Sequence, residues 1–153
     1  MREHVATAGT RIAASPQRVW QVLTDRAAVR EFMFGTELET DWNVGGPIRW
    51  HGEWQGRTYT DTGTVLEVEP PRRLVYTHFT PLGGEPEGPE TTHTLVWTLT
   101  ENGDGTLLRL EQDNNRTPEA AEHSRGMWEQ LMRSLKDVVE REPGTELTTA
   151  VPE

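Results

Sequence analysis

The chain has 153 residues, a formal net charge of −10, 33% hydrophobic residues and no cysteine. This length suffices for one domain core, and the acidic charge argues against a basic surface that binds nucleic acid. The lack of cysteine excludes disulfides and thiolate metal sites, and the five histidines follow no metal-binding spacing, so we expect neither a metal nor a cofactor.

The ends of the chain give expectations about location and domain limits. No apolar run approaches the roughly 18 residues of a membrane span, and the first residues lack the apolar centre of a signal peptide. We therefore expect a cytoplasmic protein without a membrane span. Residues 1–142 are predicted to form a single domain, and residues 143–153 to form a loose tail.

In chain order, the first predicted element is a strand over residues 4–12, where the sequence alternates. Ser15 and Pro16 then supply an N-cap and a first-turn proline for a short helix. Thr24 or Asp25 begins a second short helix, and Gly35 ends it.

Between residues 37 and 113 the hydrophobic period changes to two, which predicts six antiparallel strands. The turns are expected at Gly45-Gly46, Gln55-Gly56, residues 69–72 and residues 102–105. Residues 80–91 contain three prolines, three glycines and three glutamates, so we expect a solvated loop there.

A long C-terminal helix is predicted from Thr117, Pro118 and Glu119 to about Arg141, before Pro143-Gly144 ends it. Its predicted apolar face consists of Ser124, Met127, Trp128, Leu131, Met132, Leu135, Val138 and Val139. The elements together predict an α+β helix-grip fold: a curved, seven-stranded antiparallel sheet around a long C-terminal helix, with two short helices between the first and second strands.

Strand alternation assigns one set of side chains to the inner face of this sheet, opposite the helix. Such a sheet encloses more volume than a few side chains fill, so we expect a ligand-sized cavity. The predicted ligand-binding residues are Trp50, Trp54, Leu66, Tyr76, His78, His93, Leu95, Trp97, Leu108, Leu110, Gln112, Trp128 and Leu131.

Polar residues give the predicted cavity two different ends. If the hairpin around residues 80–91 pairs as its length suggests, His78 lies opposite His93, and Gln112 and Asn114 lie beside His93. The opposite end is apolar. Such a cavity suits a small hydrophobic or amphipathic molecule with one polar group.

Four segments resemble successive signature blocks of one family: IAASPQRVWQVLTD, DWNVGGPIRWH, GTVLEVEPPRRLVY and SRGMWEQLMRSLKDVV. The chain is similar to bacterial homologues of the heat-shock-protein-90 ATPase activator, in the SRPBCC superfamily of START lipid-transfer domains, polyketide cyclases and the birch-pollen allergen. The resemblance implies the helix-grip fold. Because this superfamily hosts carriers, enzymes and co-chaperones, it does not choose a function.

Three functions therefore stay open, and binding of a small hydrophobic molecule leads. A polyketide cyclase or aromatase-like enzyme is the first alternative, although we identify no catalytic residue, no nucleophile with a base and no paired inward carboxylates. A chaperone-linked interaction module is the second alternative. The family's eukaryotic activators carry an additional chaperone-binding domain, for which 153 residues leave no room, so a chaperone partner is the weaker expectation.

Overall fold

The computed structural model describes residues 3–141. Its elements are β1 (Ala6–Ile12), α1 (Pro16–Thr24), α2 (Arg26–Phe32), β2 (Glu37–Glu39), β3 (Pro47–Trp54), β4 (Arg57–Glu69), β5 (Arg73–His78), the 3₁₀ turn η1 (Pro81–Gly83), β6 (His93–Asn102), β7 (Gly105–Gln112) and α3 (Pro118–Arg141). The tail predicted over residues 143–153 lies outside the described residues, and the predicted domain limits stay a prediction.

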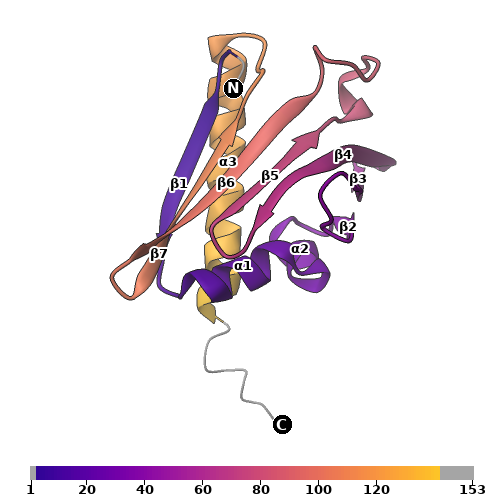
Figure 1. Cartoon of the computed structure of the whole chain (residues 1–153). Coiled ribbons are helices and arrows are strands. Elements are labelled where there is room, and N and C mark those ends of the chain that lie inside the picture. The colour runs from indigo at the N-terminus through magenta and orange to yellow at the C-terminus, as the bar shows by residue number, and fades with distance from the viewer. Residues whose placement is uncertain (1–2, 142–153) are drawn as a thin grey trace.

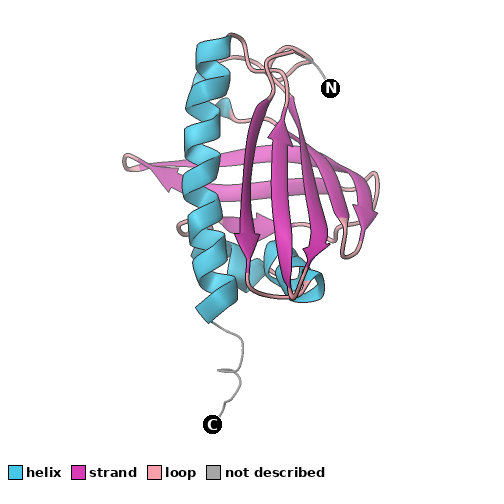
Figure 2. Ribbon diagram, turned by 90° about the vertical axis from the view of Figure 1, so that its left-hand side faces the viewer, coloured by secondary structure: helices cyan, strands magenta, loops and turns pink. Residues whose placement is uncertain are grey.

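The predicted fold is confirmed. Seven strands form one antiparallel sheet in the order β1-β7-β6-β5-β4-β3-β2, and α1 and α2 follow β1 in the chain. Figure 1 shows α3 running along one face of the sheet, with α1 and α2 at one end. Figure 2 shows the sheet curving beside this helix, so that one group of strands crosses another steeply. In the part of the chain that is described, no helix is long and apolar enough to cross a membrane.

The two short helices begin where the sequence predicts. The Ser15 side chain accepts a hydrogen bond from the Arg18 amide at the start of α1, and Asp25 accepts one from the Ala28 amide at the start of α2. Each cap satisfies a backbone donor that would otherwise lack a partner. Beyond α2, Gly35 adopts a φ of 96°, which glycine adopts without steric cost.

The C-terminal helix α3 buries most of its predicted apolar face. Leu131, Met132, Leu135, Val138 and Val139 are buried, and they join the strand residues and α1 and α2 in a single hydrophobic core. The prediction for Met127 is wrong, because this side chain is 58% exposed. Met127 lies at the margin of the apolar stripe.

A bulge in β4 reverses the expected facing of one predicted site residue. The register with β5 shifts between Val65 and Glu67, so two successive residues point away from the core. Val65 is fully buried, whereas Leu66 is 42% exposed. The prediction that Leu66 faces inward is therefore wrong, because alternation holds only where no residue is inserted into the ladder.

The prediction that Trp54 lies in the interior is also wrong. Trp54 continues the inward series of Ile48 and Trp50, but it pairs with Arg57 beside the turn at Gln55-Gly56. At this hairpin tip no other element covers the sheet, and Trp54 is 54% exposed. Alternation predicts a face of the sheet correctly here, but it does not predict what covers that face.

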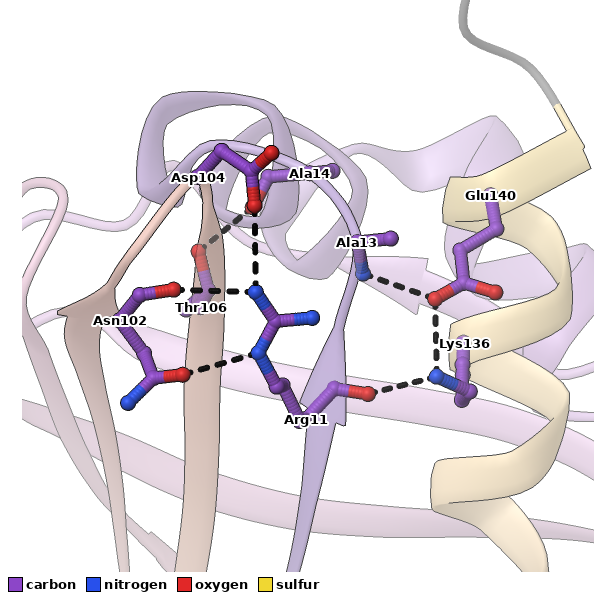
Figure 3. A network of polar contacts seen from close by, with 8 residues as sticks. All are labelled: Arg11, Ala13, Ala14, Asn102, Asp104, Thr106, Lys136 and Glu140. Carbon is purple, nitrogen blue, oxygen red and sulfur yellow. Dashed lines mark hydrogen bonds and ion pairs between the residues drawn. The ribbon is translucent and has the colours of Figure 1, made fainter.

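Polar contacts fasten α3 to the connection between β1 and α1, as Figure 3 shows. Glu140 accepts a hydrogen bond from the backbone amide of Ala13 and one from Lys136, both at 2.8 Å. Lys136 also donates to the backbone carbonyl of Arg11 at 2.6 Å. The Lys136 and Ala13 hydrogen bonds lower the pKa of Glu140. These contacts position α3 over the inner face of the sheet.

Candidate functional site

An aromatic chamber lies at the centre of the inner face. It is lined by Leu23, Val29, Phe32, Met33, Leu38, Trp42, Trp50, Leu74, Tyr76, Trp97, Trp128 and Leu131. The chamber has a volume of about 20 Å³. A ligand pocket usually measures roughly 300–1,000 Å³, so the expected ligand-sized cavity is nearly filled by its own side chains in this conformation. The bulky indole and phenol rings occupy the space that the sheet encloses.

Two indoles in the chamber are held by specific hydrogen bonds. Trp97 donates from Nε1 to the Tyr76 hydroxyl at 2.9 Å, and Trp128 donates from Nε1 to the Gln112 side chain at 3.1 Å. The Trp97 and Trp128 rings meet edge to face, with centroids 6.4 Å apart. Burial raises the pKa of Tyr76 to about 12, so this group remains a neutral phenol at physiological pH.

One wall of the chamber is formed by a strained residue. Trp42 has a φ of 56°, a left-handed conformation that is costly for a bulky side chain. Its indole donates to the Thr24 carbonyl at 3.0 Å and lies 6.1 Å from the Tyr76 ring. Trp42, Met33 and Trp128 are half-buried, so these three line the chamber where it is least enclosed.

The predicted register at the polar end of the inner face is confirmed. His78 pairs with His93 across β5 and β6, and the side chain of Asn114 donates to the backbone carbonyl of Thr92. Gln112 is buried and pairs with Leu95. His93 donates from Nδ1 to the Asp113 carbonyl at 2.8 Å. Most of this polar end is thus held by bonds within the protein.

Asp61 completes the polar end, and the sequence prediction missed it. Its Oδ2 lies 2.8 Å from Nε2 of His78, and both side chains are largely buried. A signal was present in β4, because Thr58, Thr60, Thr62 and Thr64 alternate with Tyr59, Asp61, Gly63 and Val65. The even positions form a uniform polar face, so the odd positions, Asp61 included, belong to the inner face.

An open cleft adjoins this polar end. It has a volume of about 240 Å³ and is lined by Phe79, Thr80, Gly83, Glu85, Glu90, Thr91, His93, Asn114, Asn115, Arg116 and Ala120. An ion pair joins Arg116, just before α3, to Glu85 in the loop between β5 and β6. As predicted, this loop is exposed to solvent over residues 81–87.

His78 lies between the two spaces. Its ring meets Trp50 of the chamber edge to face, with centroids 5.0 Å apart, and its strand partner His93 lines the cleft. The inner face therefore runs from a polar cleft, past the Asp61–His78 pair, to an aromatic chamber. Over residues 3–141, no three histidine or carboxylate side chains gather in a way that could hold a metal ion.

The remaining predicted ligand-binding residues lie deeper in the core. Leu108 and Leu110 are fully or almost fully buried on β7, and Leu95 is buried on β6. None of them lines the chamber or the cleft. They pack the sheet behind the site, although whether any residue of the predicted set contacts a ligand stays a prediction.

Comparisons with known proteins identify a matching family and solved structures of the same fold. Residues 13–140 match the family model described as Activator of Hsp90 ATPase homolog 1-like protein. The solution structure of ChR145 from Cytophaga hutchinsonii is 38% identical, with a TM-score of 0.80, and the match covers 92% of this chain and 97% of that one. No curated protein sequence matches.

Two further solved structures share the fold at lower identity. The Aha1 dimer from Colwellia psychrerythraea is 20% identical with a TM-score of 0.70, and the match covers 89% of this chain and 96% of that one. DynU16, from the dynemicin biosynthetic locus, is also 20% identical, with a TM-score of 0.75. That match covers 90% of this chain and 48% of DynU16, so this chain spans about half of that protein.

Proposed function

The chain belongs to the family of Activator of Hsp90 ATPase homolog 1-like proteins, and on that premise we propose that it binds a small amphipathic molecule on the inner face of its sheet. The polar part of this molecule would lie at the polar end of the inner face, beside His78 and its strand partner His93, and its apolar part would enter the aromatic chamber. The observation that carries this proposal is the position of His78, whose ring contacts Trp50 in the wall of a chamber lined by four indoles and a phenol, and whose strand partner His93 lines the polar cleft.

Binding requires the chamber to widen, because about 20 Å³ accommodates no more than one water molecule. The half-buried side chains Met33, Trp42 and Trp128 are the ones that would move, since the other lining residues are buried. Movement of the two indoles breaks their hydrogen bonds to the Thr24 carbonyl and the Gln112 side chain.

The proposal is tested by nuclear magnetic resonance on the indole N–H groups. The chain has six tryptophans, and each gives one indole signal in a ¹⁵N-labelled sample. We expect a ligand from a panel of fatty acids, sterols, flavonoids and polyketides to shift the Trp97 and Trp128 signals, because both line the chamber. Trp54 is the internal control, since it is exposed at the hairpin tip.

Substitution of single tryptophans by phenylalanine assigns these signals. Shifts confined to Trp54 and surface amides would contradict the proposal, as would an unchanged spectrum across the whole panel at saturating concentration. Capture of a protein partner instead, with the chamber signals unmoved, would favour the interaction-module alternative.

A second candidate is an enzyme that acts on the bound molecule. One observation favours it: the His78 imidazole is hydrogen-bonded to the Asp61 carboxylate, an arrangement that orients an imidazole for proton transfer. To test this candidate, the protein is incubated with each bound compound in deuterated water. Mass spectrometry then detects any product and any exchange of carbon-bound hydrogen for deuterium. Recovery of every compound unchanged and unlabelled would contradict the enzyme candidate and leave ligand binding as the proposed function.

A further inference from the structure

Two buried polar atoms of the Asp61–His78 pair lack a hydrogen-bond partner. Oδ2 of Asp61 and Nε2 of His78 bond to each other, but Oδ1 of Asp61 and Nδ1 of His78 are buried and have no partner within residues 3–141. Buried polar groups in folded proteins are almost always paired, so two such atoms in one cluster call for a physical explanation. One such explanation is a ligand that supplies the missing hydrogen-bond partner.

Asp61 determines which hydrogen bond His78 can still make. A carboxylate only accepts, so the bond at 2.8 Å places a proton on Nε2 of His78. In the neutral imidazole Nδ1 then carries a lone pair and no proton, which makes it an acceptor. With His78 in this neutral form, the two unpartnered atoms are both acceptors, and the cluster lacks a donor.

The position of the pair connects it to the proposed binding site. Asp61 pairs with Trp50 across β3 and β4, and the His78 ring touches the Trp50 ring. Gly63 makes this arrangement possible, because a Cβ there would lie 3.2 Å from the end of the Trp50 ring and 2.0 Å from the Thr77 carbonyl oxygen. The acceptors thus lie beside the wall shared with the chamber.

We propose that His78 and Asp61 select a ligand whose polar group is an uncharged hydroxyl, as in a phenol or an alcohol. This hydroxyl would donate a hydrogen bond to Nδ1 of His78. This inference rests on the proposed function, since it concerns the same inner face. A carboxylate or phosphate is disfavoured, because it offers no proton to Nδ1 and brings a negative charge close to Asp61. An ether or a bare hydrocarbon leaves both acceptors unpaired.

A matched series of probes tests this selection in the unaltered protein. The series consists of 2-naphthol, 2-methoxynaphthalene and 2-naphthoate, which share one ring system and differ in the polar group. We expect 2-naphthol to bind about tenfold tighter than the methoxy compound, the size of one added hydrogen bond, and 2-naphthoate to bind most weakly. Affinities come from the shifts of the Trp97 and Trp128 indole signals.

One substitution then assigns the selection to Nδ1 of His78. In the His78→Gln variant the side-chain amide can still donate to Asp61, but it places no acceptor where Nδ1 lies. We expect the preference for 2-naphthol over 2-methoxynaphthalene to fall to within about twofold, as the hydrogen bond is lost. His123→Gln is the matched control, because His123 is exposed on α3, and it keeps the full preference.

The outcomes separate the two proposals. Equal affinity for 2-naphthol and its methyl ether, or tightest binding of 2-naphthoate, overturns the selection and leaves the binding function standing. A preference that survives His78→Gln overturns the assignment to Nδ1. If none of the three probes moves the chamber signals while a compound of the wider panel does, the selection fails and the binding function stands; if no compound of either set moves them, both fail. Should the variant not fold, the probe series in the unaltered protein still decides.

Discussion

The bulge in β4 predicts losses of stability of different size for two neighbouring substitutions. Val65 is fully buried, and Val65→Ala removes two carbons, worth about 1.6 kcal/mol of transfer free energy at about 0.8 kcal/mol each. The cavity left behind raises the expected loss of unfolding free energy to about 2.5 kcal/mol. Leu66→Ala removes three carbons from a side chain that is 42% exposed, and it should cost less than about 1 kcal/mol.

Urea unfolding followed by tryptophan fluorescence measures this difference. With a slope of about 2 kcal/mol per molar urea, Val65→Ala should lower the midpoint by about 1.2 M and Leu66→Ala by less than about 0.5 M. The number of carbons removed alone predicts the reverse order, so the pair is a strict test of side-chain direction. A larger loss in Leu66→Ala would mean that β4 continues without a bulge.

Two more substitutions probe single hydrogen bonds. Tyr76→Phe leaves the buried Nε1 of Trp97 without its acceptor, and it should lower the unfolding free energy by about 1–3 kcal/mol in thermal or urea unfolding; an unchanged stability would show that this bond contributes nothing. Glu140→Gln should cost about 0.5–1 kcal/mol at neutral pH, because the partly exposed carboxylate loses its charge-assisted bonds to Lys136 and Ala13. Since the pKa of Glu140 is lowered in the folded state, its stabilisation is present above the ordinary glutamate range and disappears as the pH falls through the folded-state value. The difference between the two proteins should therefore vanish in acid, and a constant difference from neutral pH to strong acid would contradict this account.

Local sequence signals located the helices and the polar end of the site. Ser15 and Asp25 cap their helices because a short polar side chain satisfies the first free amides within three residues, which needs no tertiary contact. The pairing of His78 with His93 followed from the length of one hairpin. Signals of this kind depend on neighbours in the chain, so they can be interpreted without the fold.

Asp61 shows a signal that was present in the sequence and not used. Its position in β4 assigns it to the inner face, yet a carboxylate in a core needs a partner, and the partner lies seventeen residues away on the next strand. Counted from the turn between β4 and β5, the strand pairing passes the bulge at Val65–Glu67 before it reaches Asp61 and His78. Only the folded sheet shows that the two side chains meet.

The sequence by itself determined the order of elements, the antiparallel sheet, the long apolar face of α3 and the existence of an inner face rich in tryptophan. These properties depend on periodicity and capping, which are local. The tertiary structure alone decided where the alternation in β4 shifts, that Trp54 stays exposed, and that the chamber closes to about 20 Å³. Each of these depends on how far one element extends over another and on how rings from distant strands fill a shared volume, and neither quantity is encoded in the spacing of residues along the chain.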